Sequence, residues 1–122
     1  MASIEITTDN FTATVTANPI VILDFWAGWC GPCRGFAPVF EAASEEHPDI
    51  VFGKIDTEAQ QELAAAFNVR SIPTLMVFRE QVILYSEAGA LPGQAFTELI
   101  ERVRAVDMAA VHAEIAAEEG QA

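Results

Sequence analysis

Residues 20–33, Ile20-Val21-Ile22-Leu23-Asp24-Phe25-Trp26-Ala27-Gly28-Trp29-Cys30-Gly31-Pro32-Cys33, decide how this chain folds. The first seven are almost entirely apolar, which is typical of a strand covered on both faces in a sheet flanked by helices. Ala27-Gly28 then turns the chain, and from Arg34 onward the apolar positions follow a helical period. Both cysteines of the protein therefore lie where a central strand ends and a helix begins.

Strand and helix patterns alternate on both sides of this stretch. They predict strands at residues 4–6, 20–26, 50–56, 74–79 and 82–86, and helices at residues 9–17, 34–47, 57–67 and 93–106. Thr57 and Gln60 form a capping-box pattern for the third helix. Glu80-Gln81 is unfavourable in a tight turn, which favours a loop longer than two residues between the last strands. The order predicts an α/β fold with helical crossovers and one antiparallel hairpin.

Composition limits the function classes. A chain of 122 residues with 52% hydrophobic and 20% charged residues is expected to form one globular domain. Its formal charge of −12 repels phosphate backbones and anionic lipids, so we expect neither a nucleic-acid nor a membrane partner. The N-terminus lacks a signal-like apolar core, and the longest apolar run is too short to span a bilayer. We therefore expect a cytoplasmic protein, in which a cysteine pair is more often catalytic or metal-binding than structural.

Cys30 and Cys33 are spaced for reversible disulfide chemistry. Cysteines three residues apart on one helical turn can approach closely enough to bond, with glycine and proline between them. At a helix start, the Cys30 sulfur would face unpaired backbone amides and the positive end of the helix dipole, which favour the thiolate. Since the thiolate attacks, Cys30 is the expected nucleophile and Cys33 the resolving cysteine, and the exchange needs no cofactor.

Three other interpretations of the cysteine pair compete with a redox site. A structural zinc site needs four ligands, but the two histidines, His47 and His112, are far apart in sequence rather than at finger spacing. We therefore expect no metal. A structural disulfide closing four residues would remove little chain entropy. Two inert buried cysteines are the third interpretation, against which the Gly31-Pro32 insert and the strand-to-helix position argue.

Further motifs share the order and spacing of one protein family. The chain carries Asp24-Phe25-Trp26-Ala27, Trp29-Cys30-Gly31-Pro32-Cys33, Ala37-Pro38, Lys54-Ile55-Asp56, and Ile72-Pro73-Thr74-Leu75 followed by Gly89-Ala90. In this combination residues 4–106 resemble the thioredoxin family. The resemblance implies a thioredoxin fold: a central five-stranded mixed sheet flanked by four helices, with the dithiol at the end of a central strand. It divides the chain into a thioredoxin domain at residues 1–106 and an acidic, alanine-rich extension at residues 107–122.

The resemblance also implies roles for Asp24 and Lys54. An acid within an apolar strand costs stability unless it has a partner or a task, and the strand pattern alone leaves structural and functional interpretations equally open. By resemblance, Asp24 is the buried acid beneath Cys33 that accepts its proton directly or through water. Lys54, the one lysine of the chain, matches the residue that pairs with this acid; the alternative is an exposed charge at a strand end.

A substrate-binding surface is implied around the cysteines. On frequency alone Pro73 would follow a trans bond, since roughly 5% of such bonds in folded proteins are cis. The resemblance instead implies a cis-proline loop facing the dithiol, where the Ile72 backbone pairs with an extended substrate by a short form of strand addition. The expected uncharged surface consists of Trp29, Gly31, Pro32, Ile72, Pro73, Gly89 and Ala90.

Four positions depart from the common family pattern. Gly28 replaces a residue that is often polar, Arg34 stands where lysine is common, and Gly35-Phe36 replaces larger aliphatic residues. These changes leave the chemistry intact but bear on substrate preference and redox potential.

The C-terminal extension carries a separate apolar stripe. Met108, Val111 and Ile115 have helical spacing, but at 100° per residue their stripe is rotated about 80° from that of the preceding helix. A straight continuation would expose it. We expect the extension to fold back, contact another chain or fray, with fraying of residues 118–122 as the default.

The function that the resemblance implies is a general protein disulfide reductase. Its expected partners are disulfide-containing substrate proteins and an NADPH-dependent thioredoxin reductase, and the protein is expected to be a monomer that serves electron transport and redox homeostasis. Two alternatives stay open. A thioredoxin-fold interaction module, such as a subunit or co-chaperone, would keep its binding without the cysteines; a thiol oxidase or isomerase would have a much higher redox potential.

Overall fold

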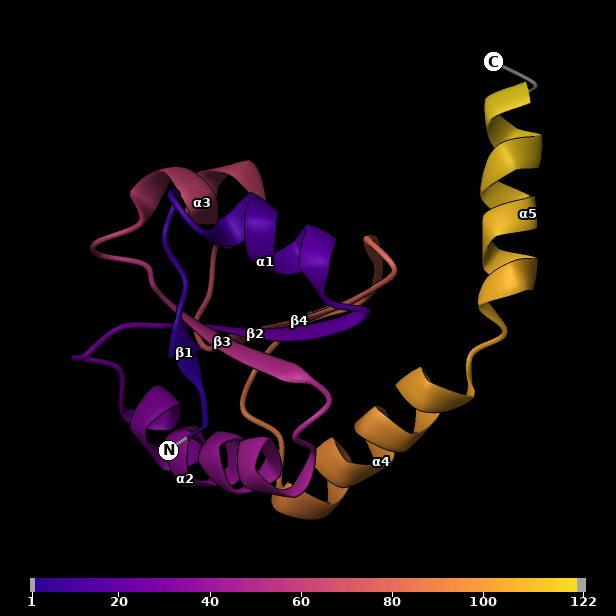
Figure 1. Cartoon of the computed structure of the whole chain (residues 1–122). Helices are drawn as coiled ribbons and strands as arrows, with labels where there is room; N and C mark the ends of the chain where they lie inside the picture. Colours follow the sequence, from indigo (N-terminus) through magenta and orange to yellow (C-terminus); the bar gives the residue numbers. More distant parts are fainter. Residues whose placement is uncertain (1, 121–122) are drawn as a thin grey trace.

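A five-stranded mixed sheet forms the centre of the computed structural model, which describes residues 2–120 (Figure 1). Its strands are β1 (Ile4–Glu5), β2 (Ile20–Trp26), β3 (Val51–Asp56), β4 (Thr74–Arg79) and β5 (Val82–Ala88). They lie in the order β1-β3-β2-β4-β5. β1, β3 and β2 are parallel, whereas β4 is antiparallel to β2 and to β5. The predicted mixed sheet is confirmed.

Helices cover both faces of this sheet. α1 (Phe11–Ala17) and α3 (Gln61–Ala66) lie on one face, and α2 (Gly31–Glu46) and α4 (Gly93–Ala105) lie on the other (Figure 1). A fifth helix, α5 (Met108–Gly120), stands beyond the end of α4 and apart from the sheet. Within residues 2–120, no helix combines the length and apolar character needed to cross a membrane.

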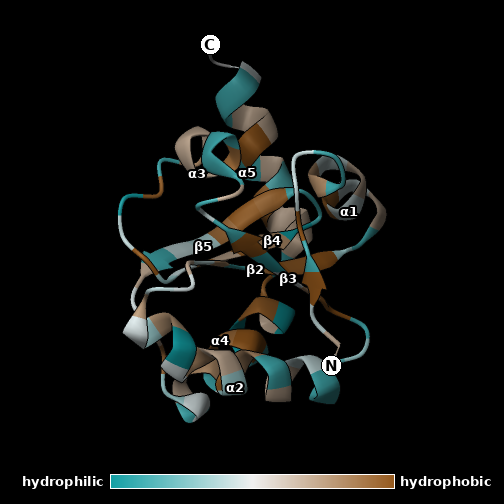
Figure 2. Ribbon diagram, turned by 90° about the vertical axis from the view of Figure 1, so that its left-hand side faces the viewer, coloured by the Kyte–Doolittle hydropathy of each residue, from teal (hydrophilic) through white to brown (hydrophobic). Residues whose placement is uncertain are grey.

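The position of β2 explains its apolar sequence. It is the middle strand, and every residue except the last is buried. Brown, hydrophobic segments run through the central strands of the sheet (Figure 2). Successive side chains of a strand point to opposite faces. Ile22 joins the core beneath α2 and α4, whereas Leu23 joins the core beneath α1 and α3. Asp24 has the parity of Ile22, so it faces α2, the helix that begins with the cysteine motif.

Four phenylalanines fix α2 and α4 on the sheet. Phe36 and Phe40 of α2 meet Phe52 of β3 and Phe96 of α4, with ring centroids 5.4 Å apart for Phe36–Phe96 and for Phe40–Phe52. All four side chains are at most 2% exposed. Burial of aromatic side chains on this scale is a dominant stabilising contribution, so the first turn of α2 is held on a rigid base.

α3 begins later than the sequence predicts, because its predicted cap has another partner. The hydroxyl and the amide of Thr57 both donate to the Trp26 carbonyl, at 3.0 and 2.9 Å. The helix therefore begins at Gln61, four residues further on. α1 also begins later than predicted, at Phe11, whereas α2 begins at Gly31, so Cys30 lies at the helix start as the redox interpretation of the sequence expects.

The loop between β4 and β5 is shorter than predicted. It consists of Glu80 and Gln81 alone, both with positive φ, at 51° and 67°. Such values match the twist of a two-residue hairpin but are usually adopted by glycine or asparagine. The Glu80 amide donates to the Pro19 carbonyl at 2.7 Å, and the Glu80 carboxylate lies 2.9 Å from Nε2 of His112. These distant contacts hold a turn that the local sequence disfavours.

A bend separates α5 from α4. The guanidinium of Arg79, at the end of β4, donates from Nη1 to three carbonyls at the C-terminal end of α4 and just beyond it. These belong to Val103, Arg104 and Val106, at 2.7, 3.2 and 3.0 Å. Carbonyls at a helix C-terminus lack partners within the helix, and a cation there is favourable. Arg79 thus fixes the point at which the chain leaves the direction of α4.

The bend brings part of the predicted apolar stripe onto the body of the protein. Met108 is 6% exposed, and Val111 and Ile115 are partly buried. The extension is a helix that contacts the rest of the protein through Met108 and through His112, whose Nε2 lies 2.9 Å from Glu80, while α5 as a whole stands apart from the sheet. The fraying prediction is wrong for residues 118–120, which are helical, and its last two residues lie outside the described part.

Candidate active site

Cys30 and Cys33 are joined at the first turn of α2. They form a disulfide with their Cα atoms 5.2 Å apart. Cys30 is the N-cap residue of the helix, and Pro32 follows within its first two positions, where a missing amide hydrogen costs nothing. The side chains are only 4% and 3% exposed. The two sulfur atoms thus lie just under the surface at the carboxyl end of β2.

The surroundings of Cys30 fit a sulfur that carries negative charge. Its Sγ accepts a hydrogen bond from the Cys33 amide at 3.2 Å, which is the N-cap interaction of α2. The amide donors and the dipole of a sixteen-residue helix both favour an anion at this point. Cys30 Sγ also lies 3.8 Å from the carbonyl oxygen of Ile72. The Cys33 amide and the helix dipole favour the thiolate form of a reduced Cys30, whereas the Ile72 carbonyl is an acceptor and does not.

Asp24 lies buried on the same side of the sheet as α2. Its side chain is 0% exposed, and neither carboxylate oxygen has a hydrogen-bond partner within residues 2–120. Burial raises the pKa of Asp24 from 3.8 to about 6, and the charge of Lys54 opposes this rise. Lys54 is the register neighbour of Asp24 on β3, and its Nζ lies 4.9 Å from the centroid of the Trp26 ring. A partly buried cation and a buried acid are thus neighbours across two strands.

Exposed residues flank the disulfide. Trp29 is 68% exposed, and Gly31 and Pro32 are exposed beside it. The Ile72–Pro73 peptide bond is cis, as the resemblance implied.

A second loop is tied to the cis-proline loop. Gly89 adopts a φ of 111°, a conformation that favours glycine, and its amide donates to the Pro73 carbonyl at 2.7 Å. Ala90 lies next to it, exposed, after the end of β5. The structure therefore brings Cys30 into contact with both Cys33 and the Ile72 carbonyl, and it joins Pro73 to Gly89. It places Asp24 and Lys54 on adjacent strands beneath.

Two contacts at this site involve residues that sequence reasoning did not assign to it. The indole Nε1 of Trp29 donates to Glu58 Oε1 at 2.7 Å, and Arg34 Nη1 donates to the Gly28 carbonyl at 2.8 Å. Glu58 follows β3 at the same sheet edge as the motif, which is the signal that could have found it. Arg34 stood out only as a departure from the family pattern.

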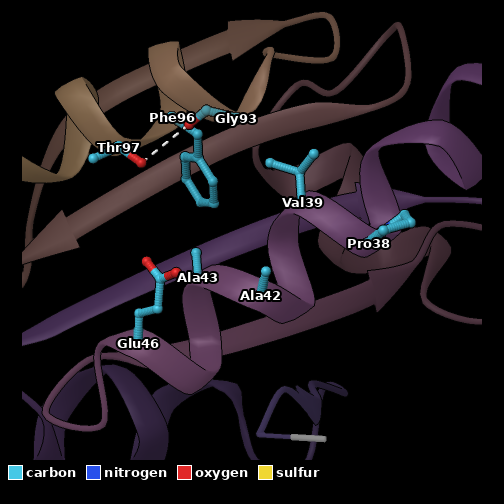
Figure 3. A pocket seen from close by; sticks show the side chains of 8 residues that line it. All are labelled: Pro38, Val39, Ala42, Ala43, Glu46, Gly93, Phe96 and Thr97. Carbon is cyan, nitrogen blue, oxygen red and sulfur yellow. Dashed lines mark hydrogen bonds between the residues drawn. The ribbon is translucent and has the colours of Figure 1, made fainter.

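A separate groove lies between α2 and α4 (Figure 3). Its volume is about 350 Å³, and apolar side chains such as Val39 and Phe96 line most of it. Glu46 provides its one ionisable group, and neither cysteine borders it. Within residues 2–120 the structure also contains no group of three or more histidine, cysteine, aspartate or glutamate side chains that could hold a metal ion.

The Cys30–Cys33 disulfide lies at the N-terminus of a helix, at the carboxyl end of a central strand. This arrangement is the reactive site of a thiol–disulfide oxidoreductase, and the fold and the site together place the protein in that class. Comparison with known protein families identifies the family within this class. The thioredoxin family model matches residues 2–102. The chain belongs to the thioredoxin family.

Individual relatives agree with this assignment. A protein of Streptomyces coelicolor assigned as thioredoxin 2 is 53% identical over 121 residues, which cover 99% of this chain and 90% of that protein. Thioredoxin of Bacillus subtilis is 39% identical over 103 residues, covering 84% of this chain and 98% of the relative. Among solved structures, a Plasmodium falciparum thioredoxin has a TM-score of 0.75 at 33% identity, covering 82% of this chain and 97% of the other.

Proposed function

We propose that this protein is a general protein disulfide reductase in which Cys30 attacks and Cys33 resolves. The Cys30 thiolate attacks one sulfur of a substrate disulfide, forms a mixed disulfide and releases the other substrate sulfur as a thiolate. Cys33 then attacks Cys30 Sγ, which releases the second substrate thiol. The substrate gains two electrons, and the protein is left with the Cys30–Cys33 bond. The observation that carries this proposal is that bond itself, formed at the N-cap of α2.

Asp24 is the proposed acceptor for the proton that Cys33 loses before it attacks. The parity of β2 turns its carboxylate toward α2, and burial holds its pKa at about 6. A group with a pKa near the working pH can both take up and release a proton during turnover. Lys54, across the register on β3, opposes the rise in the Asp24 pKa and so favours its ionised form.

The residues around the disulfide form the proposed substrate surface; most of them are exposed, whereas Ile72 is half-buried and Pro73 is buried. An extended substrate would pair with the backbone of Ile72, and its disulfide would meet Cys30, whose Sγ lies 3.8 Å from the Ile72 carbonyl. The rest of the surface, formed by Trp29, Gly31, Pro32, Pro73, Gly89 and Ala90, carries no charge. Such a surface contacts backbone and apolar area rather than one sequence, which suits a reductase with many substrates.

An NADPH-dependent thioredoxin reductase is the proposed electron donor, with disulfide-containing proteins as substrates and the cytoplasm as the working compartment. Residues 1–106 would form the catalytic domain and residues 107–122 an extension outside the chemistry. A monomer suffices for this cycle, because the described chain supplies both cysteines and the buried acid.

Insulin reduction coupled to NADPH oxidation tests the function. The wild-type protein, supplied with a thioredoxin reductase, is expected to reduce insulin disulfides catalytically, and Cys30→Ser is expected to abolish turnover. Circular dichroism and thermal melting of the variant against reduced wild-type protein control for folding. A Cys30→Ser protein that reduces insulin at the wild-type rate would refute the proposal.

A further inference from the structure

The turn between β2 and α2 has few bonds of its own. The Cys30 amide donates to the Ala27 carbonyl at 3.2 Å, and both of these residues are buried. The two residues between them, Gly28 and Trp29, are exposed. Glycine loses more conformational freedom on folding than any other residue. The Trp29 side chain is held by its bond to Glu58, at 2.7 Å, so the backbone of Gly28 is the part of this turn that depends on other contacts.

Neither the backbone nor the packing requires glycine at position 28. Its φ lies outside the left-handed region, and a Cβ added there would have no atom within 4 Å. An alanine would fit without strain and would have fewer unfolded conformations to lose. The conformational freedom that glycine allows at position 28 is thus a property of this sequence rather than a need of the fold.

Arg34 restrains the turn from the first turn of α2. Its backbone amide donates to the Cys30 carbonyl at 3.2 Å, and its side chain reaches back so that Nη1 donates to the Gly28 carbonyl at 2.8 Å. The other terminal nitrogen, Nη2, lies 3.9 Å from the point where a Cβ of Gly31 would be. One guanidinium therefore spans from the residue before Trp29 to the residue after Cys30.

We propose that Arg34 is a positioning residue for the attack by Cys30, and that its bond to the Gly28 carbonyl compensates for the freedom of glycine at that position. The Gly28 carbonyl belongs to the peptide plane between Gly28 and Trp29. Holding it fixes the rotation of that plane, which sets where Trp29 and then Cys30 begin. Productive attack on a disulfide needs the sulfur in a narrow range of positions, so a looser turn lowers the rate. Gly28 and Arg34, which both depart from the family pattern, are thus partners in one hydrogen bond.

A positioning role of Arg34 can be distinguished from an effect of its charge in two ways: by adding salt and by replacing the glycine at position 28. The Arg34 side chain is exposed, so its field at the sulfur is screened in 0.5 M KCl, where the Debye length is about 4 Å. A hydrogen bond that holds a backbone carbonyl persists there. An alanine at position 28 restricts the turn without adding any charge.

A two-by-two set of variants tests the proposal: wild type, Arg34→Gln, Gly28→Ala and the double variant. The rate at which the reduced protein attacks a neutral disulfide, hydroxyethyl disulfide, is measured by stopped flow across pH in 0.5 M KCl. Arg34→Gln is expected to slow the attack about five-fold with the same pH midpoint, and Gly28→Ala to stay within about two-fold of wild type. In the Gly28→Ala background, Arg34→Gln is expected to lower the rate of attack by less than about two-fold. Arg102→Gln, which removes one positive charge from α4, is the matched control.

Three results would overturn the proposal: an Arg34→Gln rate within two-fold of wild type, a shifted pH midpoint that accounts for the loss, or losses that multiply in the double variant. Because the proposal rests on the proposed function, wild type and Cys30→Ser are assayed on insulin in parallel. If Cys30→Ser abolishes insulin turnover but Arg34→Gln attacks the disulfide at the wild-type rate, the positioning role is refuted and the reductase function stands.

Discussion

Replacing Asp24 by asparagine should make the oxidised protein more stable at neutral pH. Asparagine has nearly the shape of aspartate but cannot ionise. In the wild-type protein the Asp24 side chain is 0% exposed and its carboxylate oxygens have no partner in the described chain, so its ionised form loses hydration without replacement. The substitution removes that cost and little else.

The size of the effect follows from the pKa of Asp24. Burial raises it from 3.8 to about 6, and one pKa unit corresponds to 1.36 kcal/mol, so ionised Asp24 costs about 3 kcal/mol of folding stability. The folded state binds the proton more tightly. The contribution of Asp24 to stability is therefore fully present below pH 3.8 and is lost as the pH rises through about 6. Asp24→Asn should gain about 3 kcal/mol at pH 7.5 and less than about 1 kcal/mol at pH 4.

Urea unfolding of both proteins in the oxidised state, from pH 4 to pH 8, measures this difference. At pH 7.5 the gain corresponds to a rise in Tm of about 10 °C for a chain of this size. Asp9→Asn, which removes an exposed carboxylate, is the matched control and should change stability little at any pH. A difference between Asp24→Asn and wild type that does not vary with pH would refute the reasoning, because burial of a charge would then not be its cause.

Three further substitutions test the packing that supports the site. Gly53→Ala should cost about 1–3 kcal/mol in urea unfolding, because the new Cβ would lie 2.5 Å from Cγ1 of Ile6; unchanged stability would show that β1 moves freely. Gly35→Ala, in open space on α2, should instead add up to about 1 kcal/mol, and a loss would contradict an unstrained second turn. Arg79→Met should remove about 1–3 kcal/mol and speed amide exchange in α5, since three carbonyls lose their shared donor; full protection of α5 would show that other contacts hold it.

The central part of the fold could be predicted from the sequence because its signals are local and strong. An apolar run of seven residues demands burial on both faces, and β2 is the middle strand. The change from strand to helix pattern after Ala27 likewise places Cys30 at a helix end, where the structure has the N-cap of α2. The cis bond before Pro73 could not be derived in this way and followed only from the family resemblance.

The incorrect predictions involve residues whose partners are distant in sequence. Thr57 has the local pattern of a helix cap, yet its hydroxyl donates to Trp26, which lies 31 residues earlier. Glu80 has poor turn chemistry, yet a bond to the Pro19 carbonyl holds it in a two-residue loop. Local sequence propensity does not include either of these hydrogen bonds, because each one forms only when the sheet is assembled.

Two contacts around the nucleophile were missed for a related reason. Glu58 and Arg34 are ordinary exposed charges by composition, and only the structure shows that each donates to or accepts from the turn that precedes Cys30. The bend before α5 was also not predictable, since the residue that fixes it, Arg79, belongs to a strand. The sequence therefore predicts the reacting pair and its strand, whereas the groups that position the pair come from the tertiary structure.

Trapping of the mixed disulfide tests the central claim most directly. Reduced Cys33→Ser and Cys30→Ser proteins are mixed with a disulfide-containing protein, and the products are identified by intact mass and peptide mapping. If Cys30 attacks and Cys33 resolves, Cys33→Ser should accumulate a stable adduct through Cys30, whereas Cys30→Ser should form little or none. An adduct that forms equally fast through Cys33 in the Cys30→Ser protein would contradict the account.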